Sequence, residues 1–89
     1  MGAVLISRND LSRLDPEAAT GIERAVARAV AGSAGAFRVS IERALGSSET
    51  VVRLEEHRPG GASWQGEVRL ASGTTPGILE ARIAALMRG

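Results

Sequence analysis

The spacing of apolar residues changes along this chain from the period of a helix to that of a strand, and then back again. Residues 16–30 place apolar side chains along one helix face, whereas residues 37–70 alternate apolar and polar positions. An alternating strand offers one apolar face to a sheet, and a helix with one apolar stripe needs a surface to cover. The change of period therefore predicts an α+β fold with helices against one face of a sheet.

The first helix has strong start signals. Asp15 is suited to cap its N-terminus, Pro16 to the first helical position, and Glu17 to the positive end of the helix dipole. The segment Gly-Ser-Ala-Gly at 32–35 predicts its end. The apolar stripe between these signals comprises Ala18, Ala19, Ile22, Ala25, Val26, Ala29 and Val30.

Three strands follow, separated by short polar turns. The first strand runs from Phe37 toward Leu45, the second from about Thr50 to His57, and the third from Trp64 to Leu70. Turn residues link them at 46–48 and 58–61. Short links between consecutive alternating strands predict a three-stranded antiparallel meander.

A second helix closes the chain. Thr75 is a candidate N-cap, Pro76 fits the first helical position, and the apolar stripe comprises Ile78, Leu79, Ile83, Leu86 and Met87. The predicted order is α-β-β-β-α, a two-layer sandwich with both helices on one face of the sheet. Residues 15–89 form the α+β domain, and residues 1–14 are either an N-terminal arm or, at 3–6, a short extra strand.

Composition narrows the possible chemistry. The 89 residues suffice for one domain, and the chain contains no cysteine, lysine or tyrosine. Disulfides, thiol catalysis and Schiff-base chemistry are thereby excluded. The net charge of +1 argues against a binder driven by phosphate contacts. The apolar run 3–6 is too short for a membrane span, and the absence of targeting signals indicates a cytoplasmic protein.

Catalytic candidates are few. His57 is the only histidine and lies next to Glu55, Glu56 and Arg58, so a His–Glu pair is a candidate general base. Of the candidate nucleophiles, Ser63 is within reach across the turn. Ser47 and Ser48 lie at the other end of the same strand, too far away to reach the imidazole. The favoured interpretation is an exposed histidine at a strand end. Arg58 and the glycines that follow it fit either an anion-binding loop or a hairpin loop with positive-φ glycines. We predict no catalytic residue, no cofactor and no metal site.

The polar face of the predicted sheet is the most informative feature. Alternation directs six charged residues to the same side: Arg38, Glu42, Arg53, Glu55, Glu67 and Arg69. These charges form either a solvated face laced with ion pairs or a recognition surface that selects a partner. Trp64 is either a core residue or a half-exposed anchor for the same partner. We take these seven residues as the candidate partner-binding set.

Absence of a convergent catalytic set favours a small non-enzymatic protein–protein interaction or assembly module. The exposed edges of a small sheet, or the broad apolar stripe of the last helix, predict a homodimer. The alternative is a nucleic-acid-binding module that uses the arginines on the polar, uncovered face of the predicted sheet. The element order resembles that of double-stranded-RNA-binding domains, but residues 74–77 at the start of the last helix contain no basic residue.

Overall fold

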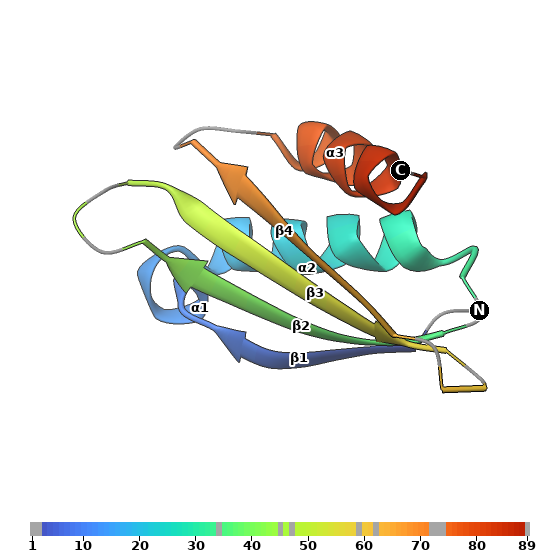
Figure 1. Cartoon of the computed structure of the whole chain (residues 1–89). Helices are drawn as coiled ribbons and strands as arrows, with labels where there is room; N and C mark the ends of the chain where they lie inside the picture. The colour runs from blue at the N-terminus through green and yellow to red at the C-terminus, as the bar shows by residue number, and fades with distance from the viewer. Residues whose placement is uncertain are drawn as a thin grey trace.

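The computed structural model describes residues 3–33, 35–44, 46, 48–58, 60–61, 63–71 and 75–88. The elements in chain order are β1 (Ala3–Asn9), α1 (Leu11–Leu14), α2 (Pro16–Val30), β2 (Ala36–Arg43), β3 (Thr50–His57), β4 (Ser63–Leu70) and α3 (Pro76–Arg88). The strands form one mixed sheet in the order β1-β2-β3-β4, and the helices α2 and α3 lie on the same side of it (Figure 1). The predicted two-layer α+β sandwich is confirmed.

The predicted meander is present as β2, β3 and β4, which pair antiparallel in an unbroken register. The register places Ile41 beside Val52, and Val52 beside Val68, so inward positions of neighbouring strands coincide. All three side chains are buried. The alternating pattern therefore identified the buried face correctly. Two predicted features, the inward position of Leu45 and the turn residue Ser47, lie outside the described residues.

The extra N-terminal strand considered for residues 3–6 is present, and it is longer than the apolar run. Strand β1 extends to Asn9 and pairs parallel with β2. Two parallel strands need a crossover connection, which the short helix α1 and the helix α2 provide. The sequence did not predict α1, whose Leu11 is buried in the core.

A β-bulge explains why the sequence indicated an earlier end for this strand. The register shifts between Ile6 and Arg8, and the Ser7 hydroxyl donates a hydrogen bond to the Val39 carbonyl. Beyond the bulge, Asn9 donates from Nδ2 to Glu23 of α2 and accepts from the Leu11 backbone N–H. The bulge breaks the two-residue alternation, and the residues that continue the strand are polar. No apolar pattern therefore predicts the part of β1 that follows Ile6.

Helix α2 begins as its start signals predict. The Asp15 carboxylate accepts a hydrogen bond from the Ala18 backbone N–H at 3.1 Å, and the helix starts at Pro16. Its buried residues face the sheet and join the core cluster; they are Ala19, Ile22, Ala25, Val26 and Val30. The core therefore lies between the sheet and the two long helices (Figure 1).

Helix α3 buries only part of its apolar stripe. Leu79 and Ile83 are fully buried, and Met87 packs against the core cluster. Ile78 and Leu86 are exposed. The stripe is therefore wider than the surface that it covers. No helix among the described residues is long and apolar enough to cross a membrane.

The neighbouring residues Leu79 and Ile78 provide a matched test of this packing. Leu79→Ala removes a fully buried side chain, and we expect the free energy of unfolding to fall by about 2–5 kcal/mol. Ile78 is 46% exposed, so Ile78→Ala should change it by less than about 1 kcal/mol. Urea unfolding followed by circular dichroism measures both. Equal losses in the two variants would contradict this orientation of α3.

Candidate functional site

The face of the sheet that the helices leave uncovered, called the open face below, carries all six predicted charged residues. The register places Arg38 opposite Glu55, and Arg53 opposite Glu67. Each pair occupies the positions between the buried ones of its strand. The prediction that Arg38, Glu42, Arg53, Glu55, Glu67 and Arg69 share one side is therefore consistent with the register of the three strands.

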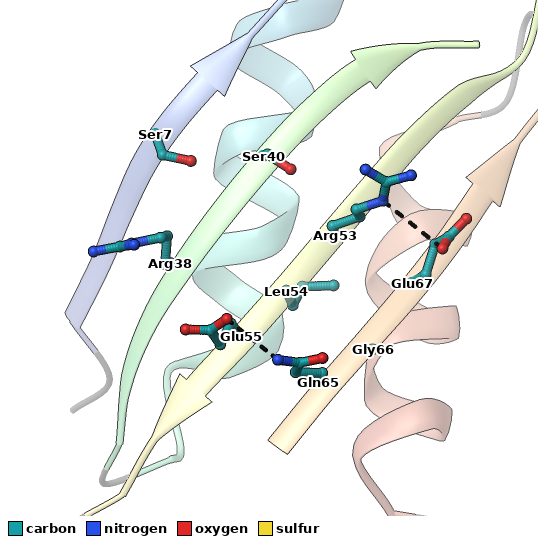
Figure 2. A pocket seen from close by; sticks show the side chains of 9 residues that line it. All are labelled: Ser7, Arg38, Ser40, Arg53, Leu54, Glu55, Gln65, Gly66 and Glu67. Atoms are coloured by element: carbon teal, nitrogen blue, oxygen red, sulfur yellow. Dashed lines mark hydrogen bonds and ion pairs between the residues drawn. The ribbon is translucent and has the colours of Figure 1, made fainter. Parts of the chain in front are cut away.

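A shallow hollow of about 520 Å³ lies at the centre of the open face (Figure 2). Four of the predicted charged residues line it, together with Ser7, Ser40, Leu54, Gln65 and Gly66. All four strands thus contribute to the lining. The two serines were not in the predicted set. Ser7 has the outward phase of Leu5 on β1, and Ser40 has that of Arg38 on β2.

Most charges of the open face form a chain of ion pairs across the strands. The Glu42 carboxylate lies 3.9 Å from Arg8 Nη1 and 3.4 Å from Arg53 Nη1. Arg53 Nε is 3.8 Å from Glu67, whose other oxygen is 3.2 Å from Arg69 Nε. The arginine side chains are more than half exposed, so each pair stabilises the fold by about 1 kcal/mol or less.

These paired charges surround one buried apolar residue on the open face. Val51 is only 5% exposed, yet it lies outside the main core cluster. Its register neighbours are Glu42 on β2 and Arg69 on β4. Long charged side chains cover apolar surface with their aliphatic parts, so these two residues are placed to shield Val51. This end of the open face therefore has a structural role.

Arg38 differs from the other arginines of the open face. Within the described part of the chain, no carboxylate lies within ion-pair distance of its guanidinium. Its register neighbour Glu55 interacts instead with His57 Nε2 at 2.5 Å and Gln65 Nε2 at 3.4 Å. Figure 2 shows the Arg38 side chain extending toward β1, away from Glu55. The guanidinium thus remains available to an external anion at the margin of the hollow.

Trp64 lies on the other face of the sheet from the six charged residues. It is partly buried and packs against the core cluster, in phase with Val68 and Leu70 as the alternation predicted. A Cβ on Gly66 would lie 2.5 Å from Trp64 Cη2 and 2.7 Å from Leu86 Cδ2. Gly66 therefore leaves the space that the indole ring fills. The structure does not bring Trp64 together with the other predicted partner-binding residues.

Glu56 is a buried carboxylate, which the sequence indicated only as a neighbour of His57. Its side chain is inaccessible to solvent and accepts hydrogen bonds from the Ser33 hydroxyl and, at 2.6 Å, from Arg58 Nε. A Cβ on Gly35 would lie 2.6 Å from Glu56 Cγ, so glycine gives this carboxylate room. The available signal was its phase, since Glu56 continues the inward positions of Val52 and Leu54.

The surroundings of Glu56 favour its ionised form. The hydrogen bond from Ser33, together with the hydrogen bond and positive charge of Arg58, lowers the pKa of this carboxyl despite its burial. The unfolded chain therefore binds a proton more readily than the folded chain. The resulting stabilisation is complete above the ordinary carboxyl pKa and is lost as the pH falls through the lowered folded pKa.

Glu56→Gln tests this role. We expect it to lower the free energy of unfolding by about 1–3 kcal/mol at neutral pH, because charge-assisted hydrogen bonds are lost. The gap from the wild type should narrow as the pH falls to about 3. Urea unfolding across this pH range measures the gap. The control Glu55→Gln, on the open face, should change stability at pH 7 by less than about 0.5 kcal/mol. A gap independent of pH would contradict the argument.

The catalytic candidates around His57 come only partly together. Ser63 is the register partner of His57, and Glu55 contacts the imidazole, but none of the described hydrogen bonds joins the serine to the ring. The His57 side chain is 60% exposed. Ser48 precedes the start of β3, whereas His57 ends that strand. Among the described residues, no group of three histidine, aspartate or glutamate side chains is arranged to hold a metal ion.

The loop after β3 uses its candidate anion-binding groups internally. Arg58 donates to Glu56, and the Gly61 N–H donates to the Arg58 carbonyl at 3.2 Å. Gly60 and Gly61 have φ values of 92° and 90°, a conformation that favours glycine. These features fit the predicted hairpin loop better than an anion site. Pro59 lies outside the described residues.

Comparison with known proteins adds no assignment. No protein-family model matches the sequence, and no curated protein matches it either. A function must therefore be argued from the arrangement of the side chains themselves.

Proposed function

We propose that the protein is a small non-enzymatic interaction module, an adaptor or assembly subunit, that binds a protein partner on its open face. One observation carries this proposal: Arg38 has no carboxylate partner among the described residues and stands at the margin of a hollow lined by all four strands. A carboxylate on the partner would complete this charge pattern. Arginine is suited to such contacts because its planar guanidinium binds a carboxylate with two hydrogen bonds.

The mixed character of the hollow favours a polypeptide as the partner. Its lining includes positively charged arginines, which donate hydrogen bonds, and negatively charged glutamates, which accept them, and Ser40 adds a hydroxyl. A partner chain supplies backbone donors and acceptors as well as an acidic side chain, and therefore complements such a surface. Charge complementarity of this kind contributes mainly to specificity and to the association rate.

The nucleic-acid alternative has weaker support. It requires the arginines to cluster while the glutamates face away, but Glu42 and Glu67 lie on the same face and form ion pairs with Arg53. Paired carboxylates offset the positive potential that attracts phosphates. The enzyme alternative requires a base and a nucleophile in contact, and the hydrogen bond described for the His57 side chain leads to Glu55, which is not a serine nucleophile.

Arg38→Glu tests the open face. Selection from a displayed library of random peptides should yield acidic sequences that bind the wild type, and Arg38→Glu should weaken that binding about tenfold or more. The matched control is Arg24→Glu, which makes the same charge change at an exposed position on α2. Binding by fluorescence anisotropy should be unchanged in this control. Urea unfolding of both variants separates lost binding from lost folding.

Two results would overturn the proposal. Equal peptide affinity for the wild type and Arg38→Glu would remove Arg38 from the site. Binding of mixed-sequence RNA or DNA oligonucleotides that falls steeply between about 50 and 200 mM salt would instead support the nucleic-acid alternative.

Self-association is the second part of the proposal. The sheet has two edge strands, β1 and β4, and small sheets commonly pair such edges with another copy. The exposed Ile78 and Leu86 on α3 offer a different route to the same homodimer.

A further inference from the structure

The two edges of the sheet differ in how well they are covered. At the β4 edge, Arg82 of α3 donates from Nη1 to the Arg69 carbonyl at 2.8 Å, and Leu86 packs close to Gly66. At the β1 edge, no described residue other than those of β2 pairs with the backbone from Ala3 to Ile6. The β1 edge is therefore the more open of the two (Figure 1).

The side chains of β1 make this edge apolar on both faces. Val4 and Ile6 are partly buried and pack against the core, whereas Leu5 is 59% exposed on the open face. The run from Ala3 to Ile6 contains no charge or proline, the features that ordinarily protect an edge strand from pairing. The bulge begins only after Ile6, so this run remains in regular register with β2.

We propose that two copies of the chain pair antiparallel along β1, around a two-fold axis at Leu5. This proposal specifies the self-association described above and rests on it. The pairing places Leu5 opposite Leu5 of the partner subunit on the open face. On the covered face, Val4 lies opposite Ile6 of the partner subunit. Apolar side chains thus meet on both sides of the joined sheet.

Neighbouring registers match less well. A two-fold axis at Val4 would place Leu5 opposite Ala3 of the partner subunit. An axis at Ile6 would place Leu5 opposite Ser7 of the partner subunit, where the bulge disturbs the edge. A register shift of one residue would turn the side chains of the second copy to the opposite face of the joined sheet, so only shifts by two residues need be compared. The axis at Leu5 is therefore the register in which the exposed leucine gains an apolar partner.

Opposite charges at position 5 test this register. Light scattering of the wild type from about 5 to 500 µM should show the mass rising from 9.2 kDa toward twice that value. Leu5→Glu and Leu5→Lys should each stay at 9.2 kDa, because like charges would face each other across the axis. An equal mixture of the two variants should regain the dimer. The control Leu14→Glu, at a 63% exposed position on α1, should behave as the wild type.

A single cysteine provides a second test, because the chain has none of its own. Directly opposed residues of an antiparallel pair have Cβ atoms about 4.5–5.5 Å apart, close to the separation that a disulfide needs. Leu5→Cys should form a disulfide-linked dimer in a glutathione redox buffer at protein concentrations where the wild type is dimeric. Ile78→Cys, on α3, should remain largely monomeric on non-reducing gels.

The possible failures differ from one another. A wild type that remains a monomer throughout would overturn both the self-association and this pairing. A dimer that survives Leu5→Glu and cross-links through Ile78→Cys would overturn only the β1 pairing and move the contact to α3. Neither result would affect the peptide-binding test of Arg38.

Discussion

Because α2 and α3 pack on the same face of the sheet, the polar half of every alternating strand is left facing outward. The chain has two aromatic residues, and its core is built mainly from valine, leucine, isoleucine and alanine between the sheet and the two helices. The described elements add no third layer to the open face (Figure 1). The arrangement of charges there follows from this constraint, since side chains excluded from the core must be solvated, paired with one another or bound by a partner.

Among the described residues, Glu56 on the covered face is an exception to this division. Glu56 is ionisable and fully buried, and its cost of desolvation is offset by Ser33 and Arg58. Both partners belong to connecting segments, one after α2 and the other after β3. The carboxylate therefore joins the connection between α2 and β2 to the segment that follows β3. Its neighbour Gly35 is constrained by the same contact, because a side chain there would collide with Glu56.

The sequence predicted those parts of the fold that depend on a local pattern of residues, such as the burial of strand positions or the start of a helix. The alternation of apolar and polar residues predicted which side chains of β2, β3 and β4 are buried, and Asp15 predicted the start of α2. The length of strand β1 was underestimated, because the bulge at Ser7 breaks the alternation. Its parallel pairing with β2 depends on the path of the crossover, which no local pattern encodes. The six charges were assigned to one face for the same reason that the strands were predicted. Which of them are paired depends on side-chain conformation as well as on cross-strand register. Arg38 lies opposite Glu55 but forms no ion pair among the described residues, and this emerged only from the structure.

The proposed β1 pairing and the proposed partner site meet at one position in the register. Leu5 on β1 is the register neighbour of Arg38 on β2. A two-fold axis at Leu5 would therefore place one Arg38 on each side of the two opposed leucines. The two open faces would then form one continuous surface with two hollows. A partner with two suitably spaced acidic groups could bind both copies, and its second contact would benefit from the high effective concentration created by the first. Dimerisation would in this way place two copies of the proposed site on one surface, which would select partners by the spacing of their carboxylates.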